Sequence, residues 1–380
     1  MRILHYSRYF PFPVAYELAI RQLRFGHDVT IVCWPGISKI SKGNYLIDGL
    51  KVSCFGIDIY TNPIRSSLVP FKLVRMVNDV ISLSNMFKSF DVVHIHGPTF
   101  YIYPQLYAKA GFCEWGVSKR LTHVSTVWTF HGHTTLVNKY WKPIINEMKY
   151  ADIHTSVNRQ IADGLKIFYI PNGVDTDKFK PLYPRPERAG FGLPDDRLVL
   201  LYVARWIPRK GHDVLVRCLS GLDRKTLKKL FVLFVGPIDS GHLDYYNNVL
   251  ADLKQLSVDF RTTYVTNEQL PTIYNFADIF CLTSRDEGNP LVLLEAMSSG
   301  LPIIILKSNY PIDVKNVVTA NTEIEFSEKL YNLIHDEELR RKLSISAREE
   351  ALNYDWSVIN KKYLSLYSKA LYETYHRRLT

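Results

Sequence analysis

Two glutamates eight residues apart, Glu287 and Glu295, are the side chains of this chain best suited to hold a polyhydroxylated ligand. Carboxylate oxygens accept hydrogen bonds from neighbouring hydroxyl groups, such as those of a sugar or a ribose. The intervening residues read GNPLVLL, in which Asn289 is expected to cap a helix and Pro290 to occupy its first position. We therefore predict that Glu287 lies in a loop and Glu295 in the second turn of the helix that follows.

The elements around these glutamates predict a βαβ unit of a parallel sheet. The helix is expected over residues 291–299, where Gly300 can close it, and apolar runs at residues 277–283 and 303–306 are expected to be strands. In such units the ligand lies at the carboxyl ends of the strands, and the start of the helix offers free N–H groups to a phosphate. The two carboxylates would then flank a bound phosphate and hold hydroxyl groups on either side of it.

Residues 284–302, SRDEGNPLVLLEAMSSGLP, resemble the E-x7-E signature of the retaining glycosyltransferases with the GT-B fold, known as family 4. The resemblance implies that Glu287 contacts the donor sugar and Glu295 the ribose of the nucleotide. It also implies that the turn between them contributes to the donor site, which would include Gly288, Asn289, Pro290 and Leu291.

A basic loop follows a second predicted strand, residues 198–204, and precedes a predicted amphipathic helix that starts at His212. The loop carries Arg205, Arg209 and Lys210, and fixed cations can stabilise the charge that builds on a leaving diphosphate as a metal ion would. The segment resembles the G-R-x4-K-G motif of the same family, which implies that Arg205 and Lys210 bind the diphosphate. We therefore expect neither a metal ion nor a cofactor, with a UDP, GDP or ADP sugar as the substrate.

The first half of the chain predicts another βαβ unit, with strands at residues 1–7 and 29–34 and a helix at residues 17–25. Its segments YFP and RFGHDVTIV resemble the family's Y-F-P-P and R-G-H-E-V-T-V motifs. The glycine-rich turn that the family has at this point is missing from residues 11–16, and a Gly-Gly turn is missing after Ile305. Two explanations remain open: these loops are lost, or mobile segments are omitted from the chain.

Histidines end two further predicted strands in the first half. The T-F-H-G stretch resembles the family's site histidine, which implies that His131 touches the donor sugar. Three histidines near strand ends could suggest zinc, but neither Glu nor Cys stands at ligand spacing around them, so no metal site is expected. His94 and His96 are expected to be structural.

Asp175 and Asp177 form a D-x-D sequence, which in many metal-dependent glycosyltransferases holds manganese. Their context, YIPNGVDTDKFKP, resembles instead the P-N-G-V-D hinge that ends the N-terminal domain of family 4 enzymes. We therefore expect a turn at this point.

The length of 380 residues predicts two domains. The expected division is an N-terminal acceptor-side domain at residues 1–175, a nucleotide-sugar-binding domain at 176–355, and a helix at 356–380 that crosses back to the first domain. The stretch 175–197 has four prolines and charges of both signs, which is typical of a linker.

The composition is that of a soluble globular protein, with 47% hydrophobic residues and no apolar run long enough to span a bilayer. The five cysteines form no C-x-x-C pair, so a reducing cytoplasm is expected. Residues 1–175 hold 19 lysines and arginines against 11 acidic residues, and such a basic face attracts anionic lipid, which would bring a lipid-linked acceptor at the inner face of the membrane to the site. The apolar and basic segment 64–77 could lie on a membrane or form a core helix, and no nucleic-acid-binding module is recognised.

Together these features predict an α/β protein with the GT-B fold, in which two Rossmann-like, doubly wound parallel-sheet domains face each other across a cleft. The expected reaction is transfer of a sugar from a nucleotide-sugar to a hydroxyl of a sugar or lipid-linked acceptor, with retention and without metal. The leaving phosphate would help to deprotonate that hydroxyl. Two alternatives stay open: a sugar-nucleotide 2-epimerase with the same fold, and a scaffold that binds nucleotide-sugar or glycan without catalysis.

Overall fold

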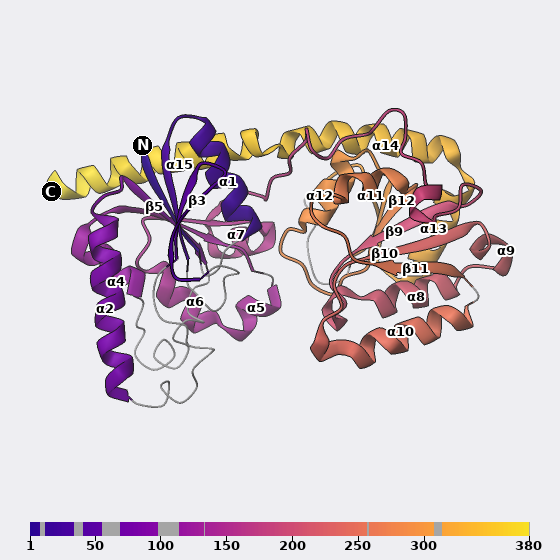
Figure 1. The fold of residues 1–380 in the computed structure, drawn as a ribbon, viewed down its shortest axis with the longest axis horizontal. Helices are drawn as coiled ribbons and strands as arrows, with labels where there is room; N and C mark the ends of the chain where they lie inside the picture. The colour runs from indigo at the N-terminus through magenta and orange to yellow at the C-terminus, as the bar shows by residue number, and fades with distance from the viewer. Residues whose placement is uncertain are drawn as a thin grey trace. The chain divides into compact units, whose positions relative to one another are not determined.

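The chain divides into two compact units, each built on a parallel sheet (Figure 1). The first unit consists of residues 1–172 and 356–380, and the second of residues 173–355. The computed structural model describes residues 1–7, 12–33, 41–54, 69–97, 114–132, 134–256, 258–307 and 314–379.

The first sheet has the strand order β3-β4-β2-β1-β5-β6-β7-β8, and its described pairs are parallel except for β3 with β4. Its strands are β1 Arg2–Ser7, β2 Asp28–Cys33, β3 Gly43–Ile47, β4 Leu50–Cys54, β5 Val92–Gly97, β6 Ser125–Phe130, β7 Ile153–Ser156 and β8 Phe168–Tyr169. Every residue of β5 and β6 is buried, as expected for strands covered on both faces. Strand β1 pairs with both β2 and β5, so the predicted βαβ unit at the start of the chain is confirmed.

The helices of the first unit are α1 Pro13–Arg24, α2 Val69–Phe87, α4 Glu114–Thr122, α5 Thr134–Lys139, α6 Trp141–Met148, α7 Arg159–Leu165 and α15 Trp356–Leu379. Helix α1 begins at Pro13, one turn before the predicted start, because proline is well tolerated in the first turn. Residues 13–16 of the glycine-poor segment are therefore helical, whereas residues 8–11 lie outside the described part. Helix α15 packs against β5, β6 and α1, and buries Tyr363 and Tyr367 completely or almost so.

The second sheet has the order β11-β10-β9-β12-β13-β14, with parallel pairs throughout the described residues. Its strands are β9 Leu198–Val203, β10 Leu230–Val235, β11 Asp259–Thr263, β12 Ile279–Leu282, β13 Ile303–Leu306 and β14 Val318–Ala320. The predicted βαβ unit is confirmed by β12, β13 and the intervening helix α12 Leu291–Ser298. The order reverses between β9 and β12, and ligands of open α/β sheets bind at such a switch point.

Helices cover both faces of the second sheet, as Figure 1 shows. They are α8 His212–Ser220, α9 Arg224–Leu227, α10 Leu243–Gln255, α11 Leu270–Phe276, α12, α13 Glu323–His335 and α14 Glu337–Ala351. Side chains of β9 alternate between the faces: Val199 and Leu201 belong to the core with α11, α12 and α14, and Leu200 and Tyr202 to the core with α8, α10 and α13. This alternation is the two-residue period of a strand buried on both sides.

The proline-rich stretch at residues 175–197, expected to be a linker, is an integral part of the second unit. Arg188 is buried there, and its guanidinium donates to the carbonyl of Phe276 at 2.9 Å and pairs with Asp278 at 2.5 Å. The predicted D-x-D turn is confirmed, because the Asp175 carboxylate accepts hydrogen bonds from the backbone N–H groups of Asp177 and Lys178 at 3.2 and 2.9 Å.

Two sequence predictions fall largely on residues that the structure does not describe. Residues 308–313, where the Gly-Gly turn of the family is missing, are one of them. The other is the possible membrane segment 64–77, of which α2 contains residues 69–77 and only the last side chain is described. Among the described helices, none combines the length and the apolar character needed to cross a bilayer.

Candidate active site

The loop after β9 approaches the end of β12 closely. It passes through a short 3-10 helix, Pro208–Lys210, and Gly211 then adopts a φ of +69° before α8 begins. A Cβ atom at Gly211 would lie 2.1 Å from the carbonyl oxygen of Thr283, so only glycine fits there. The Thr283 hydroxyl in turn donates to the carbonyl of Gly211 at 2.7 Å. The loops after β9 and β12 are therefore in direct contact at the switch point.

Lys210 and Glu287 meet where these loops touch. The Lys210 ammonium donates to the Glu287 carboxylate, with 2.5 Å between Nζ and Oε1, and the two side chains are only 17% and 7% exposed. The Arg209 guanidinium donates to the carbonyl of Asp286 at 2.8 Å and lies 3.8 Å from the other Glu287 oxygen. Two site residues predicted from separate segments are thus brought together in a pair that is largely removed from water.

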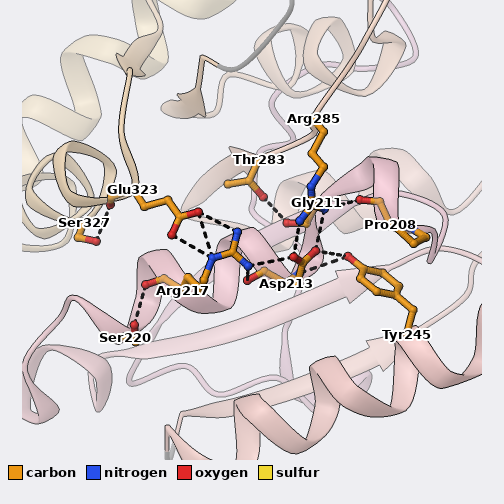
Figure 2. Close-up of polar contacts among 10 residues, drawn as sticks. All are labelled: Pro208, Gly211, Asp213, Arg217, Ser220, Tyr245, Thr283, Arg285, Glu323 and Ser327. Atoms are coloured by element: carbon orange, nitrogen blue, oxygen red, sulfur yellow. Dashed lines mark hydrogen bonds and ion pairs between the residues drawn. The ribbon is translucent and has the colours of Figure 1, made fainter. Parts of the chain in front are cut away.

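A second ion pair, which the sequence did not lead us to expect, holds the same loops in register (Figure 2). The Arg285 guanidinium donates to both carboxylate oxygens of Asp213. The backbone N–H of Arg285 donates to the backbone carbonyl of Arg209 at 2.8 Å. Tyr245 and Arg217 also donate to Asp213, at 2.6 and 3.0 Å, and Figure 2 marks both contacts. Burial acts to raise the pKa of Asp213, but the hydrogen bonds from Arg285, Tyr245 and Arg217 outweigh it and hold that pKa below its ordinary value.

Glu295 has a partner that pattern reasoning also missed. The hydroxyl of Tyr274, on α11, donates to the Glu295 carboxylate at 2.7 Å. Tyr274 is fully buried, and its burial and the adjoining carboxylate raise its pKa, so the phenol keeps its proton and remains a donor. The tyrosine therefore orients one oxygen of Glu295.

The start of α12 differs from the prediction by one residue. Pro290, with φ −72° and ψ 119°, occupies the N-cap position, and its cap has no side-chain hydrogen bond. The prediction that Asn289 caps the helix with Pro290 in its first position is therefore wrong, because the fixed φ of proline suits an extended cap as well as a first turn. Gly288 and Asn289 precede the cap, and Leu291 opens the first turn, where N–H groups have no intrahelical acceptor.

A pocket of about 330 Å³ opens at the carboxyl ends of β9, β10 and β11. Its lining is Trp206, Gly236, Pro237, Ile238, Thr262, Thr263 and Tyr264. The Trp206 ring stacks on the buried His212 ring at 4.1 Å and is itself only 1% exposed, whereas the Tyr264 side chain in the same lining is exposed. A larger pocket of about 770 Å³ lies between the end of α8 and α13. Neither pocket is lined by a predicted site residue, but the smaller one includes Trp206, the neighbour of Arg205, and lies at the edge of the sheet where the donor site is expected.

Arg205 does not join the Lys210–Glu287 pair through any contact that the described residues make. Its guanidinium, which is 61% exposed, donates to Asp239 at 2.6 Å. Backbone and side-chain hydrogen bonds, from Gly241 and from Arg205, lower the pKa of Asp239. Arg205 and Asp239 thus form an ion pair between the segments that follow β9 and β10.

His131 lies in the first unit, directly after β6, whereas the predicted donor-binding residues all lie in the second. Its Nε2 is 3.0 Å from Nδ1 of His96, and Nε2 of His96 is 2.9 Å from Nδ1 of His5. Burial lowers the pKa of His131 to about 3, so its imidazole is neutral at physiological pH.

The histidines His5, His94 and His96 lie close enough to suggest a metal site, with one ring nitrogen of each within 4.8 Å of the others. However, all six of their ring nitrogens already have a hydrogen-bond partner, among them Thr129 and Tyr367 for His94. A metal ion would have to break this network, so the donor set fits a hydrogen-bonded cluster better than a metal centre.

Two family models match consecutive parts of the chain. The model described as Glycosyltransferase Family 4 matches residues 13–178, and the model described as Glycosyl transferases group 1 matches residues 185–350. The chain belongs to the family 4 glycosyltransferases. The resemblance seen in the E-x7-E and basic-loop segments is thereby confirmed.

Relatives of this family 4 chain include D-inositol 3-phosphate glycosyltransferases. The protein of that name from Saccharomonospora viridis is 30% identical over 213 residues, which are 52% of this chain and 49% of the relative. The one from Mycobacteroides abscessus is 30% identical over 253 residues, which are 63% and 54% of the two chains. The matches therefore span about half of the length of these relatives.

Solved structures share the whole fold of this family member. A sucrose-phosphate synthase from Thermosynechococcus elongatus has a TM-score of 0.75 at 17% identity, covering 97% of this chain and 98% of that one. HepE from Anabaena, solved with UDP and glucose, has a TM-score of 0.71 at 14% identity, covering 97% and 100%. The predicted GT-B fold class is confirmed.

Proposed function

We propose that this protein transfers a sugar from a nucleotide-sugar to a hydroxyl group, with retention at the anomeric carbon and without a metal ion. The observation that carries the proposal is the meeting of Lys210 and Glu287 at the switch point of the second sheet, with Glu295 on the helix that follows. The Lys210 ammonium can bind a diphosphate, and the two carboxylates can accept hydrogen bonds from the hydroxyl groups of the sugar and the ribose.

The donor would take over the contacts that Lys210 and Glu287 now make with each other. The diphosphate would draw the Lys210 ammonium and the exposed Arg205 guanidinium, and the amides around Gly288, Asn289 and Leu291 would point at a phosphate. Pro290 has no N–H and would only shape that turn. Glu287, released from Lys210, would accept hydrogen bonds from the sugar.

Glu295, oriented by Tyr274, would accept from the ribose hydroxyls, and His131 would touch the donor sugar from the first unit. As the glycosidic bond breaks, the negative charge on the leaving diphosphate increases, and the fixed cations stabilise it. The same phosphate would accept the proton of the attacking hydroxyl as the new glycosidic bond forms, so that the proton leaves with the nucleotide.

The pocket beside Trp206 would hold the base of the nucleotide. The exposed Tyr264 side chain in its lining suits contact with a planar base. The complex of Anabaena HepE with UDP and glucose makes UDP-glucose the first donor to test, followed by GDP and ADP sugars.

The acceptor is proposed to be anionic, because basic residues outnumber acidic ones in residues 1–175. The names of the relatives offer D-inositol 3-phosphate as one candidate. A lipid-linked sugar is the other, and it would bring the protein to an anionic membrane surface on the cytoplasmic side.

The testing experiment is a thermal-shift screen of the full chain with UDP, GDP and ADP sugars, each with and without EDTA, followed by NMR of the reaction mixture. We expect one donor to raise Tm equally with and without EDTA, and the product to keep the anomeric configuration of the donor. An inverted product would overturn retention, and activity lost in EDTA would overturn metal independence.

The alternatives give different products in the same experiment. An epimerase would convert the donor into an isomer with no acceptor present. A scaffold would be stabilised by the donor and never consume it. Adding inositol phosphate, or vesicles that carry a lipid-linked sugar, separates the two acceptor classes by which one yields a glycoside.

A further inference from the structure

A chain of hydrogen bonds in the first unit links a buried glutamine on α1 to His131. Nε2 of His5 lies 2.8 Å from Oε1 of Gln22, Nδ1 of His5 lies 2.9 Å from Nε2 of His96, and Nδ1 of His96 lies 3.0 Å from Nε2 of His131. The rings of His96 and His131 are stacked, with centroids 5.1 Å apart. Gln22, His5 and His96 belong to three different elements, α1, β1 and β5, so the fold assembles this chain.

Each imidazole in the chain is neutral. His5 and Gln22 have no exposed surface, and His96 is buried as well. Burial lowers the pKa of His5 to about 4 and that of His131 to about 3, and lowers that of His96 well below its ordinary value. A neutral imidazole has one N–H donor and one acceptor lone pair, so each ring that donates at one nitrogen must accept at the other. All the hydrogen bonds between these rings therefore point in the same direction.

That direction is set at Gln22. The amide nitrogen of Gln22 donates to the hydroxyl of Tyr367 at 3.2 Å, so its oxygen faces His5. The Tyr367 hydroxyl can then donate its own proton to Nδ1 of His94, 2.7 Å away, which is consistent with this amide orientation.

The protons of the three rings follow from this one orientation. His5 must donate from Nε2 to Gln22, so its Nδ1 accepts from Nε2 of His96. Nδ1 of His96 then accepts from Nε2 of His131. The remaining lone pair is on Nδ1 of His131, a buried atom that has no hydrogen-bond partner among the described residues.

We propose that Gln22, His5 and His96 are positioning residues that hold His131 as its Nε2–H tautomer and thereby present its Nδ1 as an acceptor to a hydroxyl group of the donor sugar. The identity of the ligand rests on the proposed function, whereas the tautomer does not. Reversing the Gln22 amide would reverse every link and turn Nδ1 of His131 into a donor. A single buried amide, three hydrogen bonds away, thus selects which hydrogen bond His131 offers.

The test is NMR of the full chain labelled with ¹⁵N-histidine, in which long-range ¹H–¹⁵N correlations report the protonated nitrogen of each ring. The His131 signals are assigned by their loss in His131→Ala. We expect protonated Nε2 and unprotonated Nδ1 for His131 in the wild type at pH 7.5. Protonation on Nδ1 would overturn the proposal.

Two variants separate positioning from packing. Gln22→Met removes the amide at similar length, and the milder Tyr367→Phe removes only the hydroxyl that orients it; both should give His131 a mixture of tautomers. Leu83→Ala, a truncation of a fully buried core residue of the same unit, is the control that should leave the tautomer unchanged. An unchanged His131 tautomer in both Gln22→Met and Tyr367→Phe would show that the hydrogen bonds from Gln22 through His5 and His96 do not set that tautomer.

Kinetics provide the second readout. We expect Gln22→Met to lower kcat/KM for the nucleotide-sugar about 10-fold, the scale of one lost hydrogen bond, while the affinity for the nucleotide alone stays unchanged. An equal loss of affinity for nucleotide and nucleotide-sugar would contradict this role. Because the tautomer is measured without substrate, a protein that has the expected tautomer but transfers no sugar would overturn only the proposed function.

Discussion

The ammonium of Lys210 and the carboxylate of Glu287 lie 2.5 Å apart, although 77 residues separate them in the sequence. With both side chains largely buried, each neutralises a charge that would be costly to leave alone. A nucleotide-sugar carries a group for each of them, a diphosphate for the cation and hydroxyls for the anion. The pair therefore keeps the empty site stable and is expected to separate when a donor binds.

Lys210→Ala is expected to lower kcat about 10²- to 10³-fold, which is the usual cost of removing one group that stabilises charge in the transition state. Initial rates at saturating donor check this. Lys228→Ala, at the exposed end of α9, is the matched control and should keep wild-type turnover. Near-normal turnover by a folded Lys210→Ala protein would remove Lys210 from the diphosphate site.

Glu295→Ala is expected to weaken donor binding with little change in kcat, because the ribose contact is the same before and during the reaction. Tyr274→Phe should act in the same direction and raise Kd about 10-fold, since a hydrogen bond to a charged group contributes about 1.5–3 kcal/mol. Titration calorimetry with the donor measures both. Tyr331→Phe, on the exposed side of α13, serves as the control, and an unchanged Kd for Tyr274→Phe would show that its hydroxyl does not orient Glu295.

Arg285→Ala should reduce turnover about 10-fold or more, because the loop that carries Glu287 would lose its register with the loop that carries Lys210. The Arg285 side chain is 42% exposed, so the accompanying loss of stability is expected to stay within about 1 kcal/mol. Activity assays and thermal melts separate the two effects. The control is Arg341→Ala, which removes an exposed pair with Glu338 and should change neither. Equal turnover in the two variants would argue against a positioning role for Arg285.

The protein should lose stability as the pH falls below 6.5. Burial lowers the pKa of His5 to about 4, whereas the unfolded chain keeps the ordinary value of 6.5. Between these values the unfolded state binds a proton that the folded state does not, so the free energy of unfolding falls with pH. For His5 alone the loss between pH 7 and pH 5 is about 2 kcal/mol.

Urea titrations at pH 7 and pH 5 measure this loss. His5→Gln should reduce the difference between the two pH values, whereas the core variant Leu83→Ala should be less stable at both and keep the difference. The same difference in wild type and His5→Gln would contradict the assignment of the acid sensitivity to His5.

Local sequence patterns were reliable where one segment carries its own signals. The strand, loop, helix and strand around Glu295 follow from apolar runs, a proline and the terminal Gly300, whose φ of +72° ends α12. The same patterns misplaced the starts of α1 and α12 by one turn and one residue. Proline fits both an N-cap and a first helical turn, so Pro13 and Pro290 could not be placed from their own neighbours.

The sequence by itself determined the side chains that suit a nucleotide-sugar, because Glu287, Glu295 and Lys210 stand in short motifs with recognisable spacing. Only the tertiary structure decided their partners. Asp213 and Arg285 come from segments that meet because parallel strands place their carboxyl ends at one edge of the sheet, irrespective of their distance along the chain. Tyr274 reaches Glu295 because α11 and α12 pack against each other. Such contacts leave no periodic pattern in the sequence, so they emerge only when the fold brings the segments together.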